Sequence, residues 1–169
     1  MEEDHLIDIV DKNDKIVGCA TKEEKFEEEL ISRNVVAFIK NKKGELIIVK
    51  RSPRKRSWPN RLDLGACGNV NCGESYEDAI RREVKEELSI ECELKFIRKL
   101  YTEVDEKGKK RRYFTGVFTG TTSKKPKLSD ELLDLQHMTI GNLAKKMNSD
   151  PNLFTPSFIR EFNELNSYL

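Results

Sequence analysis

The stretch that decides the fold runs from Gly68 to Ile90 and reads GNVNCGESYEDAIRREVKEELSI. Ser75 is followed three residues later by Asp78, a pairing that caps the first turn of a helix. The apolar residues after this cap recur every four positions, as one buried side of a helix does. They are Tyr76, Ile80, Val84 and Leu88. We therefore predict a helix from about residue 76 to residue 88.

Three glutamates of this predicted helix fall at positions i, i+3 and i+4, namely Glu83, Glu86 and Glu87. Their carboxylates project from one side, opposite the apolar side, and repel one another. A divalent cation such as Mg²⁺ or Mn²⁺ takes carboxylate oxygens and keeps positions open for water and substrate phosphates. The pattern therefore predicts a metal site. The competing interpretation is a solvated charged helix surface, which is common in proteins.

The spacing of fixed residues extends beyond the helix. Gly68 is followed after five residues by Glu74, and seven more residues lead to Arg82. This arrangement resembles the Nudix box, Gx5Ex7REUxEExGU, in which U is an aliphatic residue. Every fixed position matches except the last glycine, which is Ser89 here, and a pattern of this length is far more specific than a short glycine motif. We expect Ser89 to occupy the turn after the helix, where glycine would adopt a left-handed cap more easily.

The resemblance implies a fold and an activity. Nudix proteins are α/β/α sandwiches with a mixed sheet, and most of them hydrolyse a nucleoside diphosphate linked to another group. Carried over by position, the metal ligands would be Glu83, Glu86 and Glu87. Glu86 or Glu87 would also assist the attacking water as a base. Gly68, Glu74 and Arg82 would support the loop before the helix, the last two as an ion pair that orders it.

Motifs outside the box are similar to the Nudix branch related to isopentenyl-diphosphate isomerase, and this similarity covers nearly the whole chain. They lie at residues 7–11, 51–53, 57–59 and 62–63. Cys67 falls where those isomerases carry their catalytic cysteine. A buried cysteine taken alone is more often a small core residue, so both interpretations of Cys67 stay open.

Other positions depart from the isomerase pattern. Asn69 and Ser32 stand where metal-binding histidines are expected, and Tyr113 stands where a glutamate is expected. Because the glutamate cluster of the box is intact, we predict Mg²⁺-dependent hydrolysis of a diphosphate linkage in a small nucleoside-diphosphate-type or other organic diphosphate. The alternatives are an isoprenoid diphosphate isomerase and a Nudix module that only binds a nucleotide or a protein.

Basic residues gather before the single tryptophan, Trp58; they are Lys50, Arg51, Arg54, Lys55 and Arg56. Arginines beside a metal are suited to anionic phosphates, so Arg51 and Arg54 are candidate substrate ligands, with a solvated loop as the alternative. Trp58 would stack on a base or pack as a corner of the domain. Glu131 lies in a late segment where some family members place a catalytic acid, or it belongs to an exposed turn.

The amino-acid composition limits the classes of partner that we expect the protein to bind and the cellular compartment in which we expect it. The net charge of +1, from 31 basic and 30 acidic residues, excludes a long-range field for nucleic acid or a membrane surface, so we expect a small-molecule diphosphate as partner. The four cysteines form no CxxC pair, no apolar leader or membrane-length run is present, and residues 1–4 are acidic. We therefore expect reduced thiols without disulfides in a cytoplasmic protein. Homodimerisation through either end of the chain stays open.

A length of 169 residues fits one domain. We expect residues 1–33 to form a β-hairpin with a short helix, appended to a Nudix core at 34–149, and residues 150–169 to form a C-terminal helix capped by Thr155. Strand-prone runs are 6–10, 15–20, 35–39, 46–49, 94–101 and 113–118. With a helix between them, these strands predict an α/β or α+β fold with a mixed sheet.

Overall fold

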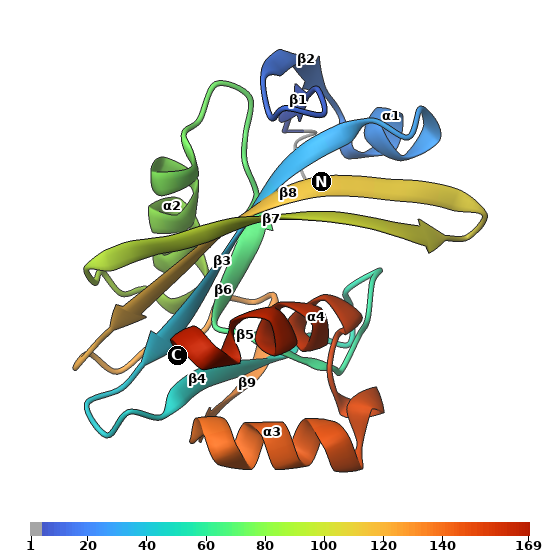
Figure 1. Cartoon of the computed structure of the whole chain (residues 1–169). Coiled ribbons are helices and arrows are strands. Elements are labelled where there is room, and N and C mark those ends of the chain that lie inside the picture. Colours follow the sequence, from blue (N-terminus) through green and yellow to red (C-terminus); the bar gives the residue numbers. More distant parts are fainter. Residues whose placement is uncertain (1–4) are drawn as a thin grey trace.

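The computed structural model describes residues 5–169 as one mixed sheet with helices on both faces (Figure 1). The strands are β1 Ile7–Val10, β2 Ile16–Ala20, β3 Ile31–Lys40, β4 Leu46–Arg51, β5 Leu62–Leu64, β6 Ala66–Asn69, β7 Leu94–Glu106, β8 Lys109–Thr121 and β9 Leu132–Met138. The helices are α1 Lys22–Glu27, α2 Tyr76–Leu88, α3 Ile140–Ser149 and α4 Pro156–Leu165, with 3-10 turns at Pro151–Leu153 and Asn166–Tyr168. Residues 1–4, whose acidic character argued against a signal peptide, lie outside the described residues.

β3 is the central strand, because it pairs with β1, β4, β6 and β8. Its pairing with β8 is parallel and runs from Ile31 to Lys40, whereas the other three pairings are antiparallel. β4 meets β3 only where Lys40 pairs with Leu46, and it then leads away to pair with β5 and β9. The sheet therefore divides beyond this point, with β6 beside β3 and with β5 and β9 beside β4.

Alternate residues of β3 face opposite helices, as the pleat of a strand requires. Val35 and Ala37 belong to the apolar cluster beneath α2. Val36 and Phe38 belong to the cluster beneath α3 and α4. Burial of these two clusters supplies the main favourable term in folding. The expected α/β/α sandwich with a mixed sheet is confirmed.

α2 begins and ends where the sequence pattern predicts, at Tyr76–Leu88. The Ser75 hydroxyl accepts a hydrogen bond from the Asp78 backbone N–H at 3.1 Å and donates one to the Asp78 carboxylate at 2.8 Å. The predicted apolar side of the helix is buried against the sheet. The helix ends at Ser89, whose φ of 53° is left-handed, as expected for a residue that stands in a glycine position.

β1 and β2 form the predicted N-terminal hairpin extension, and the structure shows how it is joined to the core. Ile9 and Val10 pair antiparallel with β3, and all four residues of β1 are buried. Ile7 also forms a bridge with Asn71 in the segment before α2. Because β1 has partners on both edges, the hairpin extends the central sheet.

The sequence patterns do not predict β5, β6, β9 and α3, and they underpredict the lengths of β7 and β8. β5 and β6 have three and four residues and are separated only by Gly65, so they are too short to show alternation. β7 and β8 continue through the charged segment because opposite charges face each other, as at Glu103 and Arg112. The charged turn expected over 105–112 is reduced to the two residues between these strands.

Cys19 of β2 and Cys72 in the segment before α2 form a disulfide with 5.7 Å between their Cα atoms. The prediction of reduced thiols throughout is therefore wrong. The two cysteines are 53 residues apart, and only the pairing of β1 with β2 and with the segment before α2 brings them together. Cys67 and Cys92 are free thiols.

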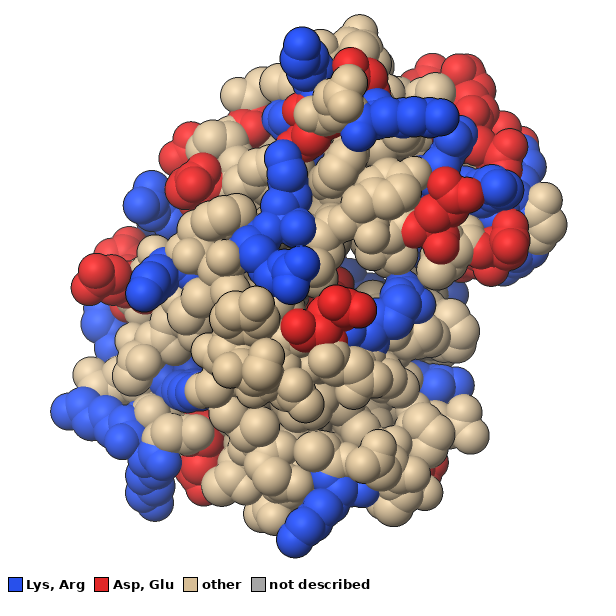
Figure 2. All heavy atoms as spheres, viewed as in Figure 1, with Lys and Arg blue, Asp and Glu red and all other residues tan. Residues whose placement is uncertain are grey.

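The surface carries both signs of charge. Figure 2 shows lysine and arginine interspersed with aspartate and glutamate over one face, without a broad patch of one sign. This face therefore offers no extended basic surface of the kind that binds nucleic acid. Among residues 5–169, no helix is both long and apolar enough to cross a bilayer.

Candidate functional site

The predicted metal ligands lie where α2 packs against β6. Gly68 of β6 has no side chain, and the Glu83 carboxyl group fills the space beside its Cα. A Cβ atom on residue 68 would lie 2.0 Å from Glu83 Oε1, closer than non-bonded atoms approach. Glycine at residue 68 therefore leaves the space that the Glu83 carboxyl group occupies, and a larger residue would displace that group.

Arg82 holds the segment between β6 and α2 in place. Its Nε and Nη2 atoms donate to the two carboxylate oxygens of Glu74 at 2.8 and 2.9 Å. Nη2 also donates to the Asn69 carbonyl at 3.0 Å, and Glu74 accepts a bond from the Asn71 N–H at 3.0 Å. These bonds close a ring from β6 through the segment to α2, which is the supporting geometry that the box implies.

Glu83 and Glu87 carry carboxyl groups that resist ionisation. Burial raises the pKa of Glu83 to about 6, with Arg82 opposing the rise and the charge of Glu86 adding to it. Burial also holds the pKa of Glu87 well above its usual range, and the charge of Glu83 adds to that rise. The Cys67 N–H, which donates to Glu87 Oε2 at 3.3 Å, offsets it only in part. A cation between these carboxylates would offset the free-energy cost of burying their charges and would reduce the repulsion between them.

Glu86, the third predicted ligand, points elsewhere. Its side chain is 60% exposed, and Arg82 Nη1 lies 3.4 Å from its carboxylate and 2.6 Å from that of Glu83. Within residues 5–169, Glu83, Glu86 and Glu87 do not bring one oxygen each within 4.8 Å of one another. For all three to hold one ion, Glu86 has to leave Arg82 and turn toward Glu83.

The donor set fits a hard divalent cation. It consists of carboxylate oxygens, the ligand type that Mg²⁺ and Mn²⁺ prefer. Burial raises the pKa values of two of the three carboxyl groups, Glu83 and Glu87, and neighbouring acidic groups add to the rise. Arg82 Nη1, which donates to Glu83 Oε1 at 2.6 Å, keeps Glu83 in position before any ion arrives.

Glu131 lies near this cluster. The sequence allows two interpretations of this residue, a catalytic acid or part of an exposed turn. It forms an ion pair with Lys55, and its carbonyl accepts a hydrogen bond from the Ser52 N–H at 3.0 Å. Besides burial, its charge contributes to raising the pKa of Glu83 and of Glu87. Glu131 is thus exposed and paired, and within electrostatic reach of the predicted ligands.

Arg51 and Arg54, the candidate phosphate ligands, differ in whether their guanidinium groups are already hydrogen-bonded within the protein. Arg51 Nη1 donates to Asp63 at 3.2 Å, and its Nε and Nη2 donate to the Ser57 carbonyl at 3.2 and 2.9 Å. The Arg51 guanidinium therefore holds the loop between β4 and β5. Arg54 is exposed, and its side chain makes no hydrogen bond within the described part of the chain. It is the freer of the two to meet a phosphate.

Trp58 lies on the surface of the same loop. It is 41% exposed, with a φ of 51°, and the Arg61 guanidinium carbon lies 5.0 Å from its ring centroid. Trp58 is thus partly exposed and packed on Arg61, and both the stacking and the packed-corner interpretations remain predictions. A surface indole held by an arginine can stack on a base.

A buried acid beside Cys67 was not predicted. Asp63, which accepts a hydrogen bond from the Thr155 hydroxyl at 3.1 Å, lies near Glu161 of α4, which is 8% exposed. Burial raises the pKa of Glu161 to about 8, and the charge of Asp63 adds to the rise. Burial, followed by the charges of Asp63, Glu87 and Glu161, also raises the pKa of the Cys67 thiol, which favours its neutral form. No sequence signal marks Glu161, because a single glutamate on an amphipathic helix is usually solvated.

The three positions that differ from the isomerase pattern carry side chains that cannot replace its metal-binding histidines and its glutamate. Ser32 and Tyr113 are register partners on β3 and β8, and both are at most 5% exposed. The Tyr113 hydroxyl accepts a hydrogen bond from Arg160 at 2.9 Å, and the Asn69 carbonyl accepts one from Arg82. A hydroxyl, a phenol and an amide thus stand where two imidazoles and a carboxylate would be required.

Comparison with known proteins settles the family. The NUDIX domain model matches residues 30–158. The chain belongs to the Nudix family. A Nudix hydrolase of Deinococcus radiodurans is 40% identical over 90 residues, which cover 53% of this chain and 53% of that protein. The chain spans about half the length of the curated Nudix hydrolases that it matches.

Two longer similarities complete the comparison. Isopentenyl-diphosphate Delta-isomerase 2 of Photorhabdus laumondii is 27% identical over 164 residues, covering 96% of this chain and 93% of that protein. The crystal structure of a Deinococcus radiodurans protein has a TM-score of 0.78 at 24% identity, covering 94% of this chain and 98% of that one.

The segment between β6 and α2, residues 70–75, is hereafter the Nudix loop. The N-terminal hairpin lies before the residues that the family model matches.

Proposed function

We propose that this Nudix protein is a Mg²⁺- or Mn²⁺-dependent hydrolase that cleaves a diphosphate linkage in a small nucleoside-diphosphate-type or other organic diphosphate. The observation that carries the proposal is the position of the Glu83 carboxyl group, which fills the space beside Gly68 and forms a partly buried acidic cluster with Glu87. Membership of a family that includes hydrolases supports the reaction class.

Each glutamate of the cluster has a proposed role. Glu83, Glu86 and Glu87 would hold the ion, which when bound neutralises the diphosphate and makes a water molecule more acidic. Glu86 or Glu87 is also the candidate general base that assists the attacking water, as the Nudix box implies. Glu74 and Arg82 keep the Nudix loop in place.

The loop between β4 and β5 would bind the rest of the substrate. Arg54 is the proposed contact to a phosphate, and Trp58 is the proposed stacking surface for the organic group. Arg51 would act mainly by keeping the loop in shape through Asp63 and Ser57.

Under the same proposal, residues 1–169 form a single Nudix domain that binds neither nucleic acid nor a membrane. Its compartment would be the cytoplasm, which suits the free thiols of Cys67 and Cys92, although a disulfide such as Cys19–Cys72 is rare there. A homodimer, if one forms, would use the open edge of β2, where Ile16 and Val17 are 54% and 65% exposed.

The second candidate is an isoprenoid diphosphate isomerase, which the similarity over 96% of the chain favours. That reaction adds a proton to carbon and needs a suitable acid beside a metal. Ser32, Asn69 and Tyr113 supply no metal ligand of the required kind, and the Cys67 thiol is buried near three acidic residues that raise its pKa. The hydrolase is therefore the better supported function.

A panel of diphosphates separates the two candidates. It contains nucleoside diphosphates, nucleoside diphosphate sugars, dinucleoside polyphosphates and isopentenyl diphosphate, each incubated with Mg²⁺ in heavy water. We expect phosphorus NMR to show hydrolysis of at least one member and proton NMR to show no deuterium in isopentenyl diphosphate. Deuterium incorporation at turnover rates would assign the isomerase instead.

Replacing Glu87 with glutamine should lower turnover by at least about 10²-fold, because glutamine keeps the shape but loses the charge that binds a hard cation. The metal-free protein should be as stable or slightly more stable, since a buried repelling carboxyl group is removed. Turnover at saturating Mg²⁺ and thermal melting with chelator measure the two effects. Glu77→Gln, at an exposed position on the same helix, is the matched control. Near-normal turnover in Glu87→Gln would show that the glutamates form only a charged helix surface.

A further inference from the structure

The N-terminal hairpin of β1 and β2 is bonded to the Nudix loop through several backbone groups. The Asp8 N–H donates to the Val70 carbonyl at 3.1 Å, and the Cys72 N–H donates to the Leu6 carbonyl at 2.9 Å. The Asp8 carboxylate is fully buried and accepts a further bond from the Gly73 N–H at 2.9 Å. The loop that precedes the metal-binding helix therefore depends on an element outside the common family domain.

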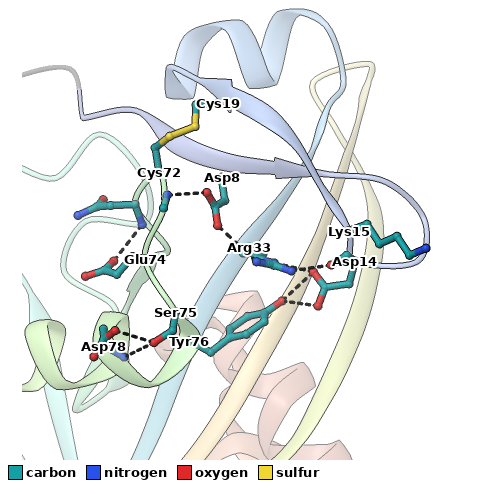
Figure 3. A network of polar contacts seen from close by, with 12 residues as sticks. Asp8, Asp14, Lys15, Cys19, Arg33, Cys72, Glu74, Ser75, Tyr76 and Asp78 are labelled. Carbon is teal, nitrogen blue, oxygen red and sulfur yellow. Dashed lines mark hydrogen bonds and ion pairs between the residues drawn. A yellow bond between two sulfur atoms is a disulfide. The ribbon is translucent and has the colours of Figure 1, made fainter.

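The same network reaches the start of α2. Arg33 Nη1 lies 3.4 Å from the Asp8 carboxylate, and Arg33 Nε donates to Asp14 at 2.6 Å. Asp14, at the turn of the hairpin, accepts a hydrogen bond from the hydroxyl of Tyr76, the first residue of α2, at 3.1 Å (Figure 3). The hairpin thus contacts both the Nudix loop and the helix that carries the glutamates.

From the loop, the contacts continue to a metal ligand. Glu74 lies two residues after Cys72 and is bonded to Arg82. Arg82 Nη1 in turn donates to Glu83 at 2.6 Å. A displacement of Cys72 from the hairpin would move Glu74 and so change how Arg82 meets Glu83.

The Cys19–Cys72 bond fixes this arrangement covalently (Figure 3). Both cysteines are exposed, so a reductant reaches the bond without unfolding the protein. Once the bond is broken, hydrogen bonds alone hold the loop on the hairpin, and the loop gains conformational freedom.

We propose that the hairpin positions the Nudix loop for metal binding and that the Cys19–Cys72 bond makes the metal affinity of the site redox-dependent. The oxidised form binds the ion more tightly, and the reduced form binds it less tightly. Asp8, Cys19 and Cys72 are positioning residues that act through Glu74 and Arg82. This inference rests on the proposed function, because it concerns the same metal site.

Formation of the bond takes an oxidant of the disulfide class, such as an oxidised low-molecular-weight thiol. The thiolate of one cysteine attacks a sulfur of that disulfide and releases one small thiol. The second thiolate then displaces the other small thiol and forms the bond between Cys19 and Cys72. The protein loses two electrons and two protons, which the external disulfide gains as two thiols, and a dithiol reverses both steps.

Mn²⁺ alone tests the inference, because electron paramagnetic resonance follows its binding without substrate. The dissociation constant is measured on the oxidised and the dithiol-reduced full chain, in wild type, Cys19→Ser and Cys92→Ser. We expect reduction to weaken binding at least about fivefold in wild type and in Cys92→Ser, and re-oxidation to restore it. Cys19→Ser should bind like reduced wild type under both conditions. Hydrogen exchange at the Cys72 and Gly73 amides should quicken on reduction.

Several outcomes would overturn the inference. Four free thiols after oxidation would show that the bond does not form. Equal Mn²⁺ affinity in both forms would reject the inference and leave the proposed metal site standing, whereas no Mn²⁺ binding in any form would reject the proposed function as well. A response retained in Cys19→Ser would assign the redox effect to another cysteine. The reduced pair with Asp8 offers three ligand atoms within 4.8 Å of one another, but thiolates are poor ligands for Mn²⁺.

Discussion

Gly68 and Ser89 occupy two glycine positions of the same sequence pattern and meet different physical demands. Gly68 is needed for space, because a Cβ atom there would lie 2.0 Å from Glu83 Oε1. Ser89 is needed only to turn the backbone, and its φ of 53° costs a serine roughly 1–2 kcal/mol. A departure from the pattern is therefore tolerable at Ser89 and damaging at Gly68.

Replacing Gly68 with alanine should lower turnover and Mn²⁺ affinity, each by about 10²-fold. The added methyl group pushes the Glu83 carboxyl group away from its position, and misplacement by about 1 Å at a reacting centre costs on that order. Titration with Mn²⁺ and steady-state kinetics measure the two losses. Gly141→Ala is the control, since no atom lies within 4 Å of the methyl group it adds. Unchanged metal affinity in Gly68→Ala would contradict the role assigned to this contact.

Glu161 should make stability fall as pH rises. Its pKa is about 8 in the folded protein, because of burial and the charge of Asp63, against an ordinary value of 4.5. Between these values the folded state holds a proton that the unfolded state has released, so the favourable contribution is complete below pH 4.5 and is lost as pH rises to about 8. Glu161→Gln stays neutral, and it should raise the free energy of unfolding by roughly 2–4 kcal/mol near pH 8.5 with little effect near pH 4.5.

Thermal melting at the two pH values measures this effect. Glu164→Gln, on the exposed side of the same helix, should change the melting temperature little at either pH. A gain of similar size in both variants, or one that does not depend on pH, would contradict the explanation by burial of Glu161.

At the scale of elements, the loop of residues 52–61 between β4 and β5 has little regular structure and is held by charged groups. Arg51 binds the Ser57 carbonyl and Asp63, while Lys55 pairs with Glu131. Arg54 and Trp58 are exposed on the loop held in this way. Arg51 at the end of β4 and Lys55 therefore keep the shape of the loop, and Arg54 and Trp58 are available to a substrate.

Single alanine variants should separate these roles. Arg54→Ala should raise KM several-fold with little change in kcat or melting temperature, because an exposed phosphate contact binds ground and transition states alike. Arg51→Ala should lower the free energy of unfolding by about 2–4 kcal/mol, because it leaves the buried Asp63 carboxyl without its cation. Steady-state kinetics and melting of both variants test the distinction. Unchanged kinetics in Arg54→Ala would make the loop a solvated basic segment.

At the scale of the whole molecule, the elements that the sequence predicts are those with local signals. α2, α4 and the N-terminal hairpin have caps, periodic apolar residues or a polar turn within a few positions, and Thr155 caps α4 as expected. β5, β6 and β9 lack such signals, since each is stabilised by partners distant in the sequence. The burial of β1 likewise depends on β3 and on the Nudix loop, so the sequence predicts the hairpin but not its pairing with the central strand.

The candidate site divides in the same way. The box places the glutamates, Glu74 and Arg82 within one local stretch, so the sequence alone suffices to propose them. The Glu161 carboxyl near Cys67, the pairing of Lys55 with Glu131 and the Cys19–Cys72 bond join residues tens of positions apart. Such contacts follow from the topology of the sheet, which a single sequence does not reveal.

The parallel pairing of β3 with β8 determines the order in which the chain can fold. Phe38 and Thr119, which are bonded across this pairing, are 81 positions apart, and β4 pairs with β9 over a similar distance along the chain. Because loops of this length must close before their contacts contribute, proteins dominated by such pairings fold in about milliseconds to seconds. The β1–β2 and β7–β8 ribbons close early, and the centre of the sheet forms late. During synthesis, a ribosome has to release the chain through residue 121 before both edges of β3 are covered, so this apolar strand is where chaperones would bind and aggregation would begin.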